Sequence, residues 1–143
     1  MSTTFGFGRE RRIRSRRDFL RVQAKTPRIA TPHFVLLLAP HPESVTAPSR
    51  LGIVVTRKIG NAVARNRIKR VCRECFRQNP ALLPPGMELV VIARQAAENL
   101  TAAEVRAEWA RAGERLKRRA LEVLAQRASE AHVSRALRGG ASE

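Results

Sequence analysis

Hydrophobic and polar residues follow one another along the chain in blocks that predict short strands between helices. Three apolar runs rich in Val, Leu and Ile are bounded by Pro, Gly or Ser, as buried strands are. These predicted strands span residues 33–39, 50–56 and 87–93. A loop rich in Pro and Ser at 41–49 is short enough for the first two strands to be antiparallel neighbours.

Helical spacing and capping residues predict three helices, at residues 16–25, 62–78 and 101–127. Ser15 is a candidate N-cap for the first helix, which carries Phe19 and Val22 on one side. Thr101 and Glu104 have the spacing of a capping box at the start of the third helix. The resulting order, α-β-β-α-β-α, predicts a two-layer α+β sandwich.

These elements predict a single domain at residues 15–127. Residues 1–14 are basic and lack periodicity, which predicts a flexible arm. Residues 128–143 contain Gly139 and Gly140, and we expect a frayed C-terminal tail there.

Charge narrows the range of partners. Lys and Arg total 28 against 12 acidic residues, which gives a formal charge of +16. A domain with this charge repels itself unless it meets a polyanion. The cations are densest at 1–25 and 50–77, whereas those of the C-terminal third alternate with Glu, as on a solvated, ion-paired helix surface. No secretory signal or membrane span is evident, so we expect a cytoplasmic protein without a membrane partner.

Residue types that support protein-borne catalysis are sparse. Cys72 and Cys75 form a Cys-x-x-Cys pair, but no second ligand pair lies near them, and we expect buried, reduced thiols. Asp18 is the only aspartate and the glutamates are dispersed. We therefore expect no catalytic residue and no metal ligand on the protein, and no small-molecule substrate.

The predicted helix at 62–78 has two chemically different faces. At about 100° per residue, its apolar side chains centre on one side. They are Ala64, Ile68, Val71, Cys72, Cys75 and Phe76. The opposite side carries a second set, with Arg65 and Arg67 at the boundary. This set is Asn66, Lys69, Arg70, Arg73 and Arg77. One face therefore suits a protein core and the other suits the phosphates of a nucleic acid.

The segment before this helix adds to the cationic face. Arg57 and Lys58 follow the second strand, and Gly60 and Asn61 suit the turn into the helix, where exposed backbone amides favour an anion. Charge and periodicity alone leave both RNA and DNA open. The lack of a helix-turn-helix pair, zinc finger or heptad zipper favours RNA.

The run from Lys58 to Arg77, centred on Arg65-Asn66-Arg67 and preceded by Arg50-x-Gly52, resembles the Arg-Asn-Arg motif of the bacterial ribonuclease P protein subunit. The resemblance extends over about residues 9–125. It implies an α/β sandwich with a small mixed sheet and a left-handed β-α-β crossover, an exception to the usual handedness. It also implies a subunit of a ribonucleoprotein that removes the 5′ leader from precursor tRNA.

The resemblance further implies two sets of contacts. The catalytic RNA would be bound by Arg57, Lys58, Asn61, Arg65, Asn66, Arg67, Lys69, Arg70 and Arg73. A cleft between the first helix and the sheet would hold the leader through Arg16, Arg17, Phe19 and Phe34, with Phe34 serving either as support for the cleft or as part of the core. The resemblance also implies further aromatic residues at the positions of Gln23 and Leu37, so we expect a smaller stacking surface in this chain. The chemistry would belong to the RNA and to the Mg²⁺ that it holds. A structural RNA-binding protein and a DNA-binding regulator are the rival functions.

Overall fold

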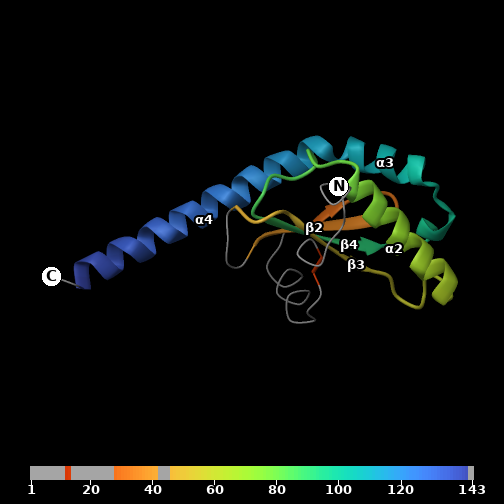
Figure 1. Cartoon of the computed structure of the whole chain (residues 1–143), viewed down its shortest axis with the longest axis horizontal. Coiled ribbons are helices and arrows are strands. Elements are labelled where there is room, and N and C mark those ends of the chain that lie inside the picture. Colours follow the sequence, from red (N-terminus) through yellow and green to blue (C-terminus); the bar gives the residue numbers. More distant parts are fainter. Residues whose placement is uncertain (1–11, 14–27, 42–45, 142–143) are drawn as a thin grey trace, which may run out of the picture.

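A computed structural model describes residues 12–13, 28–41 and 46–141, with side chains through residue 130 (Figure 1). The elements in chain order are β1 (Arg28–Ala30), β2 (Phe34–Pro40), β3 (Arg50–Val54), α2 (Ala62–Arg77), β4 (Met87–Ala93), the 3-10 helix η3 (Ala97–Asn99), α3 (Ala102–Arg111) and α4 (Gly113–Ala141). The predicted helix at 16–25 and most of the predicted basic arm lie outside the described residues.

The four strands form one mixed sheet in the order β1-β2-β4-β3. β4 pairs with β2 in antiparallel fashion and with β3 in parallel fashion, and α2 connects the two parallel strands. The prediction that the first two long strands are neighbours was therefore wrong, because β4 lies between them. Leu89, Val90 and Val91 are fully buried. Side chains that alternate between the two faces and are buried on both mark a central strand.

The sheet buries a different set of residues on each face. Phe34, Leu36 and Leu38 of β2 join the main core, which lies between the sheet and helices α2, α3 and α4. Leu37 faces the other way and forms a smaller cluster with Ile13, Ala39 and Val90. The α+β two-layer architecture is as predicted, while the left-handed sense of the crossover stays a prediction.

An ion pair lies between the two parallel strands. Arg50 Nη2 on β3 contacts Glu88 Oε2 on β4, directly across the parallel register. Glu88 is fully buried, and unpaired burial of a carboxylate is costly, so this arginine is held by the fold. Arg50 therefore belongs to the basic segment 50–77 in the sequence, but in the structure it forms an ion pair between two strands of the sheet.

The C-terminal helices cover the sheet and then extend beyond it (Figure 1). Val105, Trp109, Ala112 and Leu116 are buried along one side of α3 and α4. The predicted helix at 101–127 is divided next to Gly113, and α4 continues to Ala141. The predicted helix end near residue 127 was therefore too early, and the two glycines near the C-terminus do not end the helix before Ala141.

Candidate nucleic-acid interface

Helix α2 begins at a side-chain cap and ends before Pro80. The side-chain oxygen of Asn61 accepts a hydrogen bond from the backbone N–H of Ala64 at 2.9 Å. A Cβ at Gly60 would lie 3.0 Å from the Cβ of Ala64, so the turn leaves little room for a side chain. Asn61 belongs to the predicted RNA-binding set, and the structure shows that its amide oxygen serves the helix start.

The two faces of α2 are as different in space as they are in sequence. Ile68, Cys72, Cys75 and Phe76 are buried in the main core, and both cysteines are free thiols, as predicted. Burial raises the pKa of the Cys75 thiol above its ordinary value. The opposite face carries the polar residues, of which Asn66 and Arg70 are exposed and Lys69, Arg73 and Arg77 are half-buried.

The polar face of α2 lines an open groove with a volume of about 490 Å³. The groove is lined by Arg12, Asn66, Lys69, Arg70, Arg73, Glu74 and Arg77. We call this surface the α2 groove. It combines five cationic side chains with a single carboxylate. The lining residues of α2 are three or four positions apart, so they follow one side of the helix.

Arg12 joins the α2 groove from a distant part of the chain. The backbone N–H of Ile13 donates to the carbonyl of Leu51 at 2.9 Å, and the Ile13 side chain is buried. This contact brings the segment of Arg12 alongside β3. Sequence reasoning missed Arg12 as a site residue, because helical periodicity carries no information on which distant segment lies against the helix.

The cationic side chains of the α2 groove lie close enough to repel one another. Burial, and then the nearby charge of Arg12, lower the pKa of Arg73 from its ordinary value. Arg77 pairs with Glu74 through Nε–Oε2 at 3.1 Å and through a second contact, Nη2–Oε1. Within the described part of the chain, Lys69, Arg70 and Arg73 have no carboxylate within ion-pair distance. These three cations are available to an external anion.

The other cations of the predicted RNA-binding set lie around the groove. Arg57 and Lys58 are exposed in the turn between β3 and α2. Arg67 Nη1 donates to the carbonyl oxygen of Glu98 in η3 at 3.1 Å, so this side chain also holds the helix against its neighbour. Arg65 is half-buried. The predicted set therefore divides into a groove (Asn66, Lys69, Arg70 and Arg73) and a flank.

Of the predicted leader contacts, only Phe34 lies within the described residues. Arg16, Arg17 and Phe19 lie outside the described residues. Phe34 is fully buried in the main core, where its ring meets that of Trp109 edge to face with centroids 5.9 Å apart. Strand alternation turns the ring of Phe34 toward the helices, which agrees with a place in the core, and its assignment to the leader site stays a prediction. Leu37 lies on the opposite face of the sheet.

The described residues contain neither a membrane-spanning helix nor a cluster of metal ligands. None of their helices combines the length and apolar character needed to cross a membrane. Across residues 12–13, 28–41 and 46–141, no three His, Cys, Asp or Glu side chains gather as ligands for a metal ion.

Comparison with known proteins identifies the family. The family model for ribonuclease P matches residues 7–117. The chain belongs to the ribonuclease P protein family. It is thus a subunit of the ribonuclease P ribonucleoprotein, an endoribonuclease. The resemblance inferred from the Arg-Asn-Arg motif is confirmed.

Individual ribonuclease P proteins agree with this membership. The chain is 41% identical to the ribonuclease P protein component of Desulfatibacillum aliphaticivorans, over 65% of this chain and 76% of that protein. It is 33% identical to the component of Citrifermentans bemidjiense, over 82% of this chain and 97% of the relative.

Solved ribonuclease P proteins share the fold. The protein from Thermotoga maritima superposes with a TM-score of 0.63 at 36% identity, over 73% of this chain and 96% of that structure. The Staphylococcus aureus protein superposes with a TM-score of 0.61 at 36% identity, over 68% and 87% of the two chains. Most of α4 lies beyond residue 117, where the family match ends.

Proposed function

We propose that this protein binds the catalytic RNA of ribonuclease P through the α2 groove and its flank, and promotes removal of the 5′ leader from precursor tRNA. The observation that carries the proposal is the α2 groove itself, where Lys69, Arg70 and Arg73 have no carboxylate partner among the residues that the structure describes. The function of the ribonuclease P relatives gives these cations a partner of matching charge.

The spacing of the cations supports a phosphate-binding role. Residues three and four apart on a helix lie about 5–6 Å from each other, close to the separation of phosphates along a strand. Arginine can bind phosphate oxygens through two parallel hydrogen bonds, and lysine adds a point charge. Each neutralised phosphate releases counterions, so binding through this surface should weaken steeply with salt. Asn66 at the groove can both donate and accept, which suits a base edge or a 2′-hydroxyl.

The chemistry is assigned to the RNA. Mg²⁺ held mainly by that RNA would supply the activated water and stabilise charge at the phosphodiester. The α2 groove does not fit a divalent cation, because it is lined by cations and its one carboxylate is paired with Arg77. The protein's own part is to screen phosphate charge and to hold RNA segments in place.

The proposal assigns the 5′ leader to the face of the sheet opposite the helices, with Arg16, Arg17 and Phe19 as its contacts. Two observations support this choice. The helices cover the face of the sheet that carries Phe34. On the opposite face, Val35, Val54 and Ile92 are only partly buried. The buried cluster on this face consists of the aliphatic residues Ile13, Leu37, Ala39 and Val90, so leader binding here should depend more on cations than on stacking.

The compartment is proposed to be the cytoplasm. Cys72 and Cys75 are both free and buried, and free thiols are typical of a reducing compartment.

Reconstitution tests the proposal. Ribonuclease P RNA and precursor tRNA would be combined at low Mg²⁺, with and without the protein, and leader removal followed by gel. We expect the protein to accelerate cleavage at the leader junction and to show no cleavage without the RNA. The variant Lys69→Gln/Arg70→Gln/Arg73→Gln should lose most of the acceleration. Cleavage by the protein alone would overturn the assignment of the chemistry, and no effect of the protein would overturn the function.

A competition assay separates the rival partners. Folded ribonuclease P RNA, an unrelated structured RNA and duplex DNA would compete for the protein at one stated salt concentration, since charge-driven affinities have no meaning without it. The proposal requires ribonuclease P RNA to compete best. Equal competition by the unrelated RNA would indicate a general RNA-binding protein, and better competition by DNA would indicate a DNA-binding regulator.

A further inference from the structure

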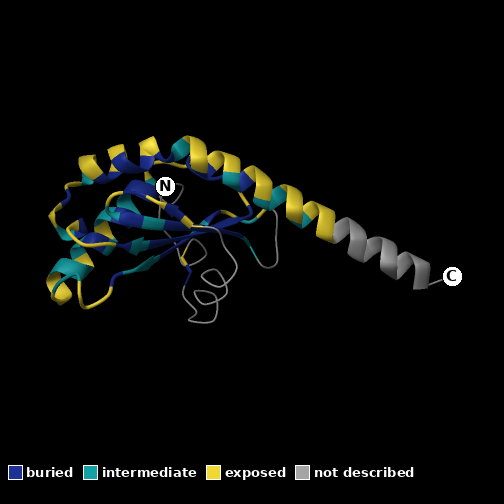
Figure 2. Cartoon of the chain, turned by 180° about the vertical axis from the view of Figure 1, so that it is seen from behind, coloured by how far each residue is buried: buried dark blue, intermediate teal, exposed yellow. Residues whose placement is uncertain are grey.

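A second line of arginines lies on the outer surface of α3 and α4. Arg111, Arg115 and Arg118 are all exposed, at spacings of four and three residues. Arg115 and Arg118 share one side of α4, away from the buried Leu116, and Arg111, the last residue of α3, is exposed next to the buried Ala112. We call these three residues the α4 stripe. Figure 2 shows the exposed outer side of these helices above the buried inner side.

The α4 stripe lacks the ion pairs that its sequence suggested. Alternation of Arg with Glu in the C-terminal third predicted a surface covered by ion pairs. Among the described residues of α3 and α4, the only ion pair between neighbours on these helices is Arg119–Glu122 at 3.0 Å. Arg111 and Arg118 have no carboxylate partner there, and Arg115 makes only a long contact of 3.5 Å to the carbonyl of Ala30.

The closely spaced positive charges of the α4 stripe destabilise the helix when no anion is bound. Like charges three and four residues apart destabilise a helix. Glu114 is the one acidic residue between Arg111 and Arg118, and Lys117 and Arg118 add charge in the same turn. The stripe is therefore a surface whose repulsion is relieved by an external polyanion, as the α2 groove is.

We propose that the α4 stripe is a second RNA-binding surface, which takes the phosphate backbone of a structured RNA. The proposal rests on the function proposed above and extends it, because the stripe lies on different helices from the α2 groove. The stripe spans about 10 Å along the helix axis, so its three guanidinium groups match successive phosphates. We assign these phosphates to a second segment of the catalytic RNA, because α2, α3 and α4 pack on the same face of the sheet and the leader is assigned to the other face.

The fold favours this use of α4. The first turns of α4 pack on the core through Leu116 and Ala120, both fully buried, while Arg115 and Arg118 stay exposed. The stripe therefore lies on a helix surface that the core holds in place. Cations on a fixed helix bind without the entropic cost of ordering a flexible segment.

Salt titration of RNA binding tests the α4 stripe. The variant Arg111→Gln/Arg115→Gln/Arg118→Gln removes three charges with little change in helix propensity. The control Arg28→Gln/Arg106→Gln/Lys117→Gln removes three exposed charges outside both surfaces, which corrects for the loss of net charge. Each protein would be titrated with the catalytic RNA and, separately, with precursor tRNA. The slope of log affinity against log salt would be measured.

We expect the stripe variant to reduce the slope with the catalytic RNA by roughly three units, and the control to reduce it much less. A reduction confined to precursor tRNA would overturn the choice of the catalytic RNA as the partner. Equal slopes for the stripe and control variants with the catalytic RNA would overturn the inference. The variant Arg70→Gln/Arg73→Gln, measured in parallel, reports on the α2 groove alone. If it reduces the slope while the stripe variant does not, the proposed function stands and only the second surface fails.

Discussion

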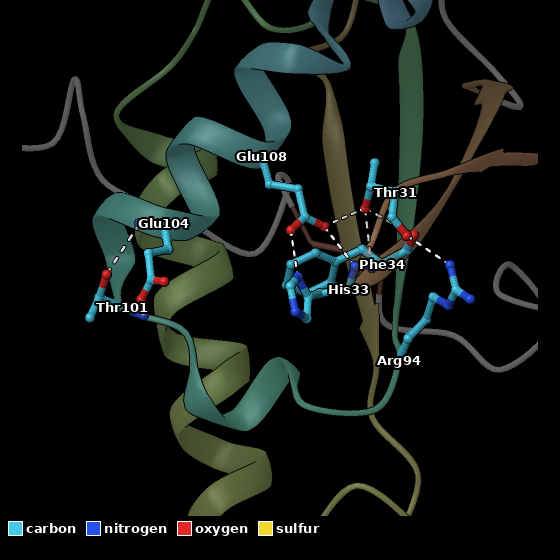
Figure 3. A network of polar contacts seen from close by, with 7 residues as sticks. All are labelled: Thr31, His33, Phe34, Arg94, Thr101, Glu104 and Glu108. Atoms are coloured by element: carbon cyan, nitrogen blue, oxygen red, sulfur yellow. Dashed lines mark hydrogen bonds and ion pairs between the residues drawn. The ribbon is translucent and has the colours of Figure 1, made fainter.

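Glu108 on α3 accepts a hydrogen bond at 2.5 Å from the hydroxyl of Thr31, which lies 77 residues earlier in the chain (Figure 3). The same carboxylate accepts from the backbone N–H of His33 at 2.8 Å and contacts its Nδ1 at 2.7 Å. Arg94 Nη1 donates to the carbonyl of Thr31 at 2.8 Å. The turn between β1 and β2 is thereby joined to α3 through one nearly buried carboxylate.

The first prediction concerns this carboxylate and pH. Burial alone would raise the pKa of Glu108, but hydrogen bonds from Thr31 and His33 outweigh it and lower the pKa below its ordinary value. The folded protein therefore holds the charged form more tightly than the unfolded chain does. The resulting stability is fully present above the ordinary carboxyl pKa and is lost as pH falls through the lowered one.

Glu108→Gln tests this account because it keeps the shape and removes the charge. We expect it to lower the free energy of unfolding by about 1–3 kcal/mol near neutral pH. The difference from the wild type should stay level down to about pH 5 and shrink as the solution becomes more acidic. Urea unfolding over a pH series measures it. A difference that grows on acidification would contradict the assignment.

The second prediction separates helix capping from RNA contact at Asn61. Asn61→Ala removes the acceptor for the Ala64 N–H and should cost about 1 kcal/mol of stability. Asn61→Ser keeps an N-cap oxygen and should restore most of that loss. If capping is the role of this residue, the serine variant binds the catalytic RNA like the wild type. Weak RNA binding by a fully stable serine variant would instead show a direct contact.

The third prediction uses the opposite charges within the α2 groove. Lys69→Ala, Arg70→Ala and Arg73→Ala should each reduce the salt slope of binding to the catalytic RNA by roughly one unit, as each removes one phosphate contact. Glu74→Gln removes the one carboxylate of the groove and should strengthen binding. Filter binding at several salt concentrations gives both quantities. An unchanged slope in all three cation variants would mean that this face points away from the RNA.

Sequence pattern located the long elements of the protein but not their neighbours. β4 was predicted at its observed bounds, yet its central place depends on pairing with both β2 and β3. The continuous apolar run Leu89–Val90–Val91 carried a signal, because a strand buried on both faces has neighbours on both sides. β1 was missed, since three residues are too few to show a period of two.

In the candidate site too, the sequence predicted contacts within one helix but not contacts between distant segments. The α2 face was predictable because helical spacing alone determines which of its residues lie together. Arg12 was not predictable, as it reaches the groove through the contact of Ile13 with Leu51. The ion pair that holds Arg50 to Glu88 is likewise a consequence of strand register. The α4 stripe depended on which pairs form in space, and sequence alternation with Glu suggested the opposite.

The last prediction contrasts the two phenylalanines first assigned to leader binding. Phe34 packs against Trp109 in the core, so Phe34→Ala should cost about 3–5 kcal/mol of stability. Phe34→Leu retains most of the apolar volume and keeps the fold testable. Since the ring is fully buried, this variant should bind precursor tRNA with and without its leader in the same affinity ratio as the wild type. Phe19→Ala, by contrast, should weaken the binding of leader-bearing precursor tRNA relative to the RNA without a leader, because stacking on one base contributes about 1–3 kcal/mol. Affinities for the two RNAs, measured with the ribonuclease P RNA present, give the ratio. A folded Phe34→Leu protein that selectively loses the leader-bearing RNA would instead place Phe34 in the leader site.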